Sequence, residues 1–151
     1  MSQYTVLICD DNEVVHQSLS LYLKSDGIRT VSVYDGETAL RLVKEQSFDL
    51  VILDPPAFTK TRSAVEGALR GYKEINLKGM KLVKDGGYLV TCSCSQHVTP
   101  PLFRQMLLDA QKDARVKLRL VEWRSQGKDH PILLGSPETE YLKCAIFQVF
   151  K

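Results

Sequence analysis

The sequence lacks the features that mark membrane-spanning, secreted and disulfide-stabilised proteins. Its longest apolar runs are about six residues, far short of the roughly 20 needed to cross a bilayer. The first residues, MSQYTVLICDD, lack the basic flank and long apolar stretch of a signal peptide. A chain of 151 residues can bury about two thirds of the surface of its unfolded form without disulfides or a structural metal. We therefore expect a cytoplasmic protein that makes no membrane contact.

Cysteine is scarce and does not form a metal-binding pattern. The four cysteines are Cys9, Cys92, Cys94 and Cys144, and each lies in or at the end of a segment that reads as a buried strand. Cys92 and Cys94 form a lone C-x-C pair without the second pair that a four-ligand zinc site requires. The cysteines are thus expected to be reduced thiols.

Net charge is only +2, but it is unevenly distributed. Residues 1–54 carry nine acidic and four basic side chains, whereas residues 55–151 carry nine acidic and sixteen basic ones. Such an asymmetry can mark a surface that faces nucleic acid. The alternative is that the two segments have different histories.

Apolar segments with β-branched residues alternate with segments of helical periodicity, which predicts an α/β fold. Two final strands with no room for a crossover helix between them predict an antiparallel hairpin. No internal repeat or low-complexity tract interrupts the pattern. The expected strands cover about 4–9, 29–33, 48–54, 88–92, 116–124 and 141–150, and the expected helices cover 13–26, a segment after Asp35, a segment from Val65 to before Gly86, and a segment that starts at Pro100.

Three aspartates follow the first and third predicted strands. Asp10, Asp11 and Asp54 should converge, because neighbouring parallel strands direct their carboxyl ends into one crevice. Clustered carboxylates suit Mg²⁺. The stretch from YTVLICDD to FDLVILD resembles a bacterial response-regulator receiver domain of the chemotaxis type. This resemblance implies that Asp10, Asp11 and Asp54 hold Mg²⁺ and that Asp54 accepts a phosphoryl group. The alternative is that Asp10 and Asp11 are only caps and turn formers.

The receiver resemblance stops after Asp54, where Pro55-Pro56 follows. A receiver also has a hydroxyl at the end of its fourth strand, for which Thr91 is a candidate, and a lysine at the end of its fifth. The predicted hairpin leaves no place for that lysine. Without its positive charge on the phosphoryl oxygens, phosphoryl transfer should suffer.

A second resemblance begins at Phe48. The motifs DPPAF and TCSCS, followed by DHPILLGSPETEYLKCAIFQVF, resemble the carboxyl-terminal portion of class I S-adenosylmethionine-dependent methyltransferases of the 5-methylcytosine type that act on large-subunit ribosomal RNA. This resemblance implies that Asp54, Pro55 and Pro56 lie beside the cofactor and the target base, and that a cysteine is the nucleophile.

The chemistry explains the need for a thiol. Carbon 5 of cytosine is a poor nucleophile until a thiolate adds at carbon 6, and thiolate is a strong side-chain nucleophile. Cys92 is the first choice and Cys94 the alternative, while a plain core thiol is the other reading of Cys92. The basic side chains that could hold RNA phosphates, or could equally be part of a solvated helix face, are Arg62, Arg70, Lys73 and Arg124.

The glycine-rich turn that such methyltransferases place after their first strand is absent. The first strand leads into Cys9-Asp10-Asp11-Asn12, and only Asp35, after the second strand, could bind the ribose hydroxyls. On this basis we expect no required cofactor: S-adenosylmethionine should not bind, and Mg²⁺ could.

FDLVILD serves equally well in both families, so the change of family falls inside a buried strand. Natural fusions usually join whole domains through linkers. These observations predict an engineered chimera, built from a receiver-like part (about 1–54) and a methyltransferase-like part (about 55–151, with similarity from about 48). The expected fold is a single domain of three αβα layers with a doubly wound, mostly parallel six-stranded sheet, a flavodoxin-like and Rossmann-like hybrid. The order would be 2-1-3-4-6-5 with strand 6 antiparallel. We expect a scaffold that is not an enzyme and has no partner, with RNA bound only if the methyltransferase ancestry is retained.

Overall fold

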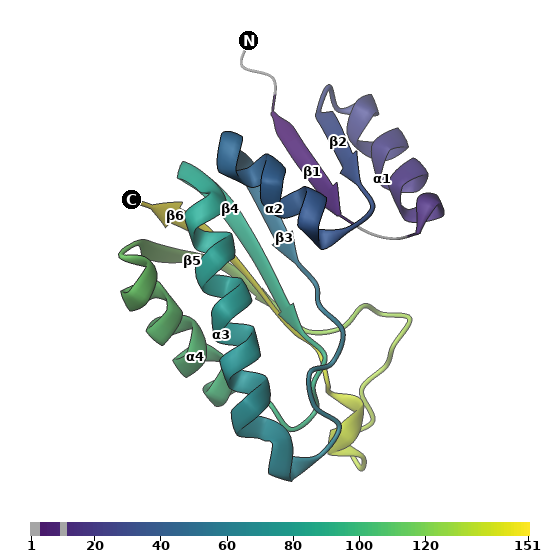
Figure 1. Ribbon diagram of the computed structural model, residues 1–151. Helices are drawn as coiled ribbons and strands as arrows, with labels where there is room; N and C mark the ends of the chain where they lie inside the picture. The colour runs from purple at the N-terminus through teal and green to yellow at the C-terminus, as the bar shows by residue number, and fades with distance from the viewer. Residues whose placement is uncertain (1–3, 10–11) are drawn as a thin grey trace.

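One continuous sheet joins the receiver-like and methyltransferase-like parts of the chain. The computed structural model describes residues 4–9 and 12–151, and in these residues six strands lie in the order β2-β1-β3-β4-β6-β5. Strand β6 is antiparallel to both of its neighbours, while β2, β1, β3 and β4 are parallel. The predicted fold class, strand order and antiparallel last strand are confirmed (Figure 1).

The elements follow the predicted alternation of strands and helices closely. The strands are β1 (Thr5–Cys9), β2 (Arg29–Val33), β3 (Phe48–Leu53), β4 (Val83–Ser93), β5 (Lys117–Arg124) and β6 (Lys143–Phe150). The α-helices are α1 (Glu13–Ser25), α2 (Gly36–Glu45), α3 (Val65–Leu82) and α4 (Pro100–Ala114), and two short 3₁₀ turns, η1 (Arg62–Ala64) and η2 (Pro137–Thr139), lie in loops.

Local side-chain chemistry sets the helix ends. The Asn12 side chain accepts a hydrogen bond from the Val14 backbone N–H at 2.9 Å and so caps α1. Helix α4 starts at Pro100, where the missing backbone N–H would have had no helical partner. It ends at Ala114, and the C-cap residue Arg115 adopts the left-handed conformation with φ 58°.

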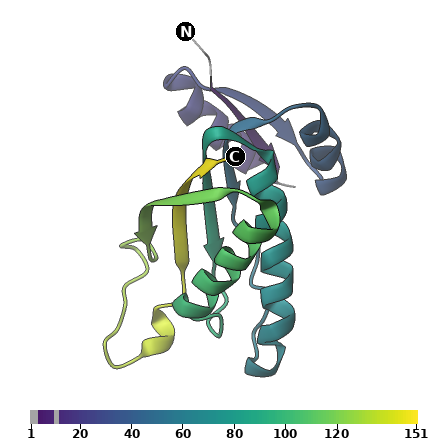
Figure 2. The same ribbon diagram turned by 90° about the vertical axis from the view of Figure 1, so that its left-hand side faces the viewer.

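The two faces of the sheet are covered unequally. Helices α2, α3 and α4 lie on one face, whereas α1 lies alone on the other (Figures 1 and 2). The main core fills the space between the first face and the helices α3 and α4, and aromatic contacts such as the Tyr72–Phe103 pair lie within it. The buried members of this core are Ala68, Tyr72, Met80, Val83, Leu89, Val98, Phe103, Met106, Leu107, Ala110, Val116, Ala145, Phe147 and Val149.

The second face of the sheet carries a strip of partly exposed apolar side chains. Ile52 pairs with Val90, and Val90 pairs with Ile146, so these three side chains share a face. Ile52 is 57% exposed, and Val90 and Ile146 are half-buried. In Figure 2 none of the described helices lies over this part of β4 and β6. We refer to Ile52, Val90 and Ile146 as the open strip.

Strand β4 begins earlier than the sequence predicted. Val83 already pairs with Phe48, and the ladder then skips to Leu50 opposite Tyr88. The intervening bulge contains Gly86 at φ 78°, a conformation that glycine adopts without the steric cost paid by other residues. The Gly-Gly pair therefore lies inside the strand as an irregularity rather than between the helix and the strand.

No helix in the described part of the chain is long and apolar enough to cross a membrane.

Candidate functional site

The carboxyl ends of β3 and β4 bring together the two motifs that were singled out in the sequence. Leu53 pairs with Thr91 in the parallel β3–β4 ladder, so Asp54 and Cys92 are the next residues along the two strands. Burial is the main cause that raises the pKa of Cys92, and the negative charge of Asp54 adds to it. Asp54 is exposed, Pro55 is half-buried and Pro56 is exposed. The DPP loop is therefore open at the edge where α/β folds bind ligands.

Cys92 is held as a neutral thiol. Its side chain is 8% exposed, and it lies directly opposite Cys144 in the antiparallel β4–β6 ladder. Burial raises the pKa of the Cys92 thiol well above its usual range, and the hydrogen bond with Cys144 and the charges of Cys144, Asp54 and Cys94 raise it further. A thiol in these surroundings is a weak nucleophile at neutral pH.

Cys94 has a different environment. It lies one residue beyond the end of β4 and is half-buried. The next residue, Ser95, accepts a hydrogen bond at its carbonyl oxygen from the Lys143 ammonium group at 2.7 Å.

Lys143 is the functional candidate that the sequence analysis missed. It is only 4% exposed, and its Nζ donates hydrogen bonds to the carbonyl oxygens of Ser95 at 2.7 Å and Tyr141 at 2.8 Å. Burial lowers the pKa of Lys143 to about 8, against the opposing effect of negative charge at Cys94. A sequence signal was available, because Lys143 shares the strand face of Ala145 and Phe147, which are core residues.

An open pocket of about 510 Å³ lies beside Lys143, between the start of β6 and the first turn of α4. Its lining mixes charges of both signs with backbone near a helix N-terminus, which suits a polar ligand better than an apolar one. The charged and titratable side chains that line it are Arg62, His97, Glu138, Glu140 and Lys143.

The loops that follow β3 and β4 are tied to each other through α3. The Tyr72 hydroxyl on α3 lies 2.9 Å from the Ser95 hydroxyl, and the backbone N–H of Thr59 donates to the same Ser95 oxygen at 3.5 Å. Phe58, in the DPPAF motif, stacks on Tyr72 with ring centroids 4.5 Å apart. The ring of Phe58 also packs so close to Gly71 that a Cβ there would lie 3.0 Å from it. These contacts fix the DPPAF and TCSCS segments relative to one another.

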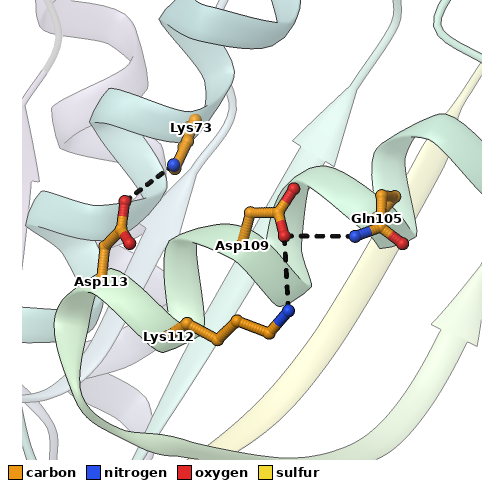
Figure 3. Close-up of polar contacts among 5 residues, drawn as sticks. All are labelled: Lys73, Gln105, Asp109, Lys112 and Asp113. Atoms are coloured by element: carbon orange, nitrogen blue, oxygen red, sulfur yellow. Dashed lines mark hydrogen bonds and ion pairs between the residues drawn. The ribbon is translucent and has the colours of Figure 1, made fainter.

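Of the four cations predicted to bind RNA phosphates, three form ion pairs within the chain. Arg70 pairs with Glu66 at 2.9 Å and Arg124 with Glu122 at 2.6 Å. Figure 3 shows Lys73 of α3 reaching Asp113 of α4, with a separation of 2.7 Å. Arg62 differs from these three in that it lines the pocket beside Lys143.

The predicted magnesium site can be followed only at Asp54. Asp10 and Asp11 lie outside the described residues. Among the residues that the structure does describe, no group of three or more His, Cys, Asp or Glu side chains could hold a metal ion.

Asp35, the one candidate for the ribose hydroxyls, lies at the end of β2 as expected. It caps α2 by accepting hydrogen bonds from the Thr38 backbone N–H and the Thr38 hydroxyl, both at 2.7 Å. These bonds lower the pKa of Asp35, so it stays ionised. Each of its oxygens keeps a second lone pair for another donor.

Comparison with known proteins gives two different matches. Residues 6–55 match the response regulator receiver domain family. Ribosomal RNA large subunit methyltransferase I of Shewanella frigidimarina is 41% identical over 105 residues, which is 70% of this chain and 26% of that protein. The same-named protein of Erwinia tasmaniensis is 43% identical over 98 residues, 65% of this chain and 25% of that protein. The chain thus spans about a quarter of the length of these curated relatives.

Solved structures show similarity of fold. SMU.776, described as a candidate methyltransferase in complex with SAH, aligns with a TM-score of 0.69 at 13% identity, over 94% of this chain and 38% of that one. A methyltransferase homologue from Pyrococcus horikoshii aligns with a TM-score of 0.56 at 15% identity, over 95% of this chain and 53% of that one. The fold that this chain shares with these neighbours is Rossmann-like.

These comparisons correct the functional expectations. The hypothesis of a designed scaffold that is not an enzyme is wrong, because natural proteins named as ribosomal RNA methyltransferases share 41% to 43% identity with most of the chain. The expectation of no required cofactor, and that S-adenosylmethionine would not bind, is wrong for a related reason: a neighbour of the same fold is described in complex with SAH.

Proposed function

We propose that this chain performs the base-activating chemistry of an S-adenosylmethionine-dependent methyltransferase that acts on carbon 5 of cytosine in large-subunit ribosomal RNA. The observation that supports the proposal is that Asp54-Pro55-Pro56 follows β3 at the same edge of the sheet where the thiols of Cys92 and Cys94 lie at the end of β4. The names of the relatives support RNA as the substrate and methyl transfer as the reaction.

Cys94 is the nucleophile in this proposal. It is half-buried at the end of β4, whereas Cys92 is buried and its raised pKa keeps it protonated. The Cys94 thiolate forms a bond to carbon 6 of the base, and the electron pair of the 5,6 double bond becomes available at carbon 5. After methylation the proton on carbon 5 is removed, the double bond reforms, and the carbon–sulfur bond breaks to release the thiolate. Cys92 then acts as a packing residue behind the reacting thiol.

The DPP loop orients the base in this reaction. Pro55 and Pro56 have fixed φ angles and no backbone N–H, so the loop offers a rigid wall with only carbonyl acceptors. The exposed Asp54 carboxylate can accept a hydrogen bond from the exocyclic amine of cytosine. The contact between Phe58 and Tyr72 anchors the loop to α3.

One residue that the structure describes, Asp35, is suited to binding the ribose of S-adenosylmethionine. Asp35 is ionised and exposed at the end of β2, and it retains lone pairs for two ribose hydroxyls. S-adenosylmethionine, when bound, would supply the methyl group as an electrophile.

The test uses RNA in which 5-fluorocytosine replaces cytosine, because the fluorine cannot leave as a proton does and the protein stays attached to the base. We expect a covalent protein–RNA adduct on a denaturing gel in the presence of S-adenosylmethionine. It should be lost in Cys94→Ser and kept in Cys9→Ser, a matched change at an exposed thiol. An adduct that forms in Cys94→Ser but not in Cys92→Ser would identify Cys92 as the nucleophile instead. The absence of any adduct and of methyl transfer in the unchanged protein would refute the proposal.

The receiver-family match over residues 6–55 favours a second candidate function. In it, Asp10, Asp11 and Asp54 bind Mg²⁺, and Asp54 accepts a phosphoryl group from a small phosphodonor. Acetyl phosphate with Mg²⁺ should then add about 80 Da to the protein, the mass of one phosphoryl group, as seen by intact mass spectrometry. The adduct should be absent from Asp54→Asn. Equal labelling of Asp54→Asn would exclude this candidate.

A further inference from the structure

We propose that Leu133 and Leu134, in the loop between β5 and β6, form an apolar wedge that packs against the RNA bases beside the target cytosine. We refer to this loop, residues 125–142, as the hairpin loop. The inference rests on the proposed function, because it names the part of the chain that would keep the target base out of its stack.

The hairpin loop leaves the sheet at the edge that carries the candidate site. Strands β4 and β5 are both antiparallel to β6, so they are parallel to each other and end at the same edge. Strand β3 is parallel to β4 and ends there too. In Figures 1 and 2 the loop that contains η2 lies at the end of the molecule where α3 begins. The hairpin loop and both site motifs therefore share one edge.

The hairpin loop is held against the segment that carries Cys94. The Lys143 ammonium group donates to the carbonyl oxygen of Tyr141, in the loop, at 2.8 Å and to that of Ser95 at 2.7 Å. Ser95 directly follows Cys94 in the chain. The pocket of about 510 Å³ lies between the same two segments, since residues of both line it. The hairpin loop is thus one wall of the candidate site.

Hydrogen bonds fix the tip of the hairpin loop. The Ser136 backbone N–H donates to the Leu133 carbonyl oxygen at 2.9 Å, and the Leu133 backbone N–H donates to the Thr139 hydroxyl at 2.9 Å. The Thr139 hydroxyl donates in turn to the Ser136 carbonyl oxygen at 2.7 Å. Leu134 and Gly135 form the corner of this turn. The tip therefore presents its side chains from a defined backbone.

Three consecutive aliphatic side chains at this tip are exposed. Leu134 is 100% exposed, Leu133 is 57% exposed and Ile132 is 42% exposed. Single exposed apolar residues are common on protein surfaces. A run of three on an ordered turn is unfavourable in water and is typical of a contact surface. The partner of this tip should therefore offer an apolar face.

The proposed reaction supplies such a face. A thiolate adds to carbon 6 from above or below the cytosine ring, and in a stacked base the neighbouring bases occupy those positions. Enzymes that modify bases therefore take the target out of the stack, at the cost of unstacking and unpairing it. Apolar side chains such as leucine fill the space between neighbouring bases in nucleic acids. Leu133 and Leu134 lie at the edge of the sheet where this space would open.

The charge of the hairpin loop favours contact with bases over contact with phosphates. Residues 129–142 contain three acidic side chains, Asp129, Glu138 and Glu140, and no lysine or arginine. Phosphate groups are bound mainly by cations, so this part of the loop is unsuited to them. Arg62, which lines the same pocket, offers a cation for a phosphate.

The test measures binding to a single-stranded oligocytidylate RNA that carries fluorescein at one end, by fluorescence anisotropy. This probe has a cytosine at every position, so no target sequence is needed. We expect Leu134→Ser to bind about fivefold more weakly than the unchanged protein, because the burial of an apolar side chain is lost. Leu21→Ser is the matched control, since Leu21 on α1 is 72% exposed, and it should leave the affinity unchanged.

The dependence on salt separates a wedge from an ionic contact. A side chain that packs against bases releases no counterions, so the slope of log Kd against log salt should be the same in Leu134→Ser and in the unchanged protein. Leu134→Trp reports the contact directly. Stacking on bases should quench its added fluorescence when the RNA binds, with the signal of Trp123 subtracted, whereas the fluorescence of Leu21→Trp should not change.

Equal affinities of Leu134→Ser and the unchanged protein would overturn the proposal, and so would the absence of RNA binding. A fluorescence change in Leu134→Trp that follows protein concentration without RNA would assign the tip to contact between copies of the chain instead. The covalent-adduct test is separate from these measurements. An adduct together with equal affinities would refute the wedge alone, whereas weaker binding by Leu134→Ser without any adduct or methyl transfer would count against the proposed function alone.

Discussion

Cys92 and Cys144 lie opposite each other on neighbouring strands, as one register pair of the antiparallel β4–β6 ladder. Their side chains share the sheet face that does not carry the main core. Burial disfavours a thiolate at Cys92, and the hydrogen bond and charge of Cys144 and the charge of Asp54 add to this effect.

Cys92 should therefore be inert to alkylation in the folded protein. We expect iodoacetamide at pH 8 to modify the exposed Cys9 at least about tenfold faster than Cys92, because burial removes both access and the reactive thiolate. Peptide mapping after a short exposure measures the two rates in one sample. Comparable labelling of both sites under native conditions, with fast labelling of both in urea as the reference, would contradict the buried assignment of Cys92.

Lys143 should impose a distinct pH dependence on stability. Below about pH 8 the folded and unfolded states both carry the proton. Between pH 8 and the unperturbed pKa of 10.5 the folded state has released it while the unfolded state has not. The free energy of unfolding of the unchanged protein, minus that of Lys143→Met, should therefore rise across this window, by at most about 3 kcal/mol.

Urea denaturation at several pH values measures this difference. The raised pKa of Cys92 acts in the opposite direction, since it lowers stability at alkaline pH, but it is present in both proteins and cancels. A flat difference between pH 7 and pH 10 would show that Lys143 titrates normally.

The bond between the Tyr72 and Ser95 hydroxyls should contribute to stability. Both residues are fully buried, so Tyr72→Phe removes a buried hydrogen bond and should lower the free energy of unfolding by about 1 kcal/mol. Tyr22→Phe is the matched control, because Tyr22 is 74% exposed. Thermal or urea unfolding distinguishes the two, and equal effects would mean that the bond does not stabilise the loop after β4.

The unequal covering of the sheet predicts unequal costs of truncation on its two faces. Leu89 lies in the main core with no exposed surface, so Leu89→Ala should cost about 2 to 5 kcal/mol. Ile52 belongs to the open strip, and Ile52→Ala should cost less than about 1 kcal/mol because most of its side chain remains in water. Urea denaturation of both variants makes the comparison, and a cost for Ile52→Ala as large as that for Leu89→Ala would show that something covers the strip in solution.

The fold was predictable because its signals are local and periodic. Runs such as Thr5–Cys9 and Phe48–Leu53 are apolar and bounded by turn residues, and the hairpin of β5 and β6 followed from the absence of a crossover helix. The start of β4 was missed, because Gly86 and Gly87 indicated a break where the strand instead accommodates a bulge.

The site was predictable only in part. The convergence of Asp54 with the cysteines follows from the rule that parallel strands share a carboxyl edge. The choice between Cys92 and Cys94 depends on burial and on the opposing Cys144, which a sequence pattern does not contain. The pairing of Lys73 with Asp113 depends on how α3 meets α4, so the sequence alone could not remove Lys73 from the RNA-binding candidates. The expectation of an inactive scaffold depended on the missing glycine turn, and the similarity to natural proteins named as methyltransferases contradicts it.

The contact between β1 and β3 is narrow: Val6 opposite Leu50 is its one register pair in the described ladder, whereas β4 and β6 share six. Backbone amides of β1 and β2 should accordingly exchange with deuterated solvent through a local opening that leaves β4, β5 and β6 protected. Because Asp35 follows β2, its carboxylate would move with β1 and β2 in this opening. The thiol of Cys94, which follows β4, would keep its place beside β4 and β6.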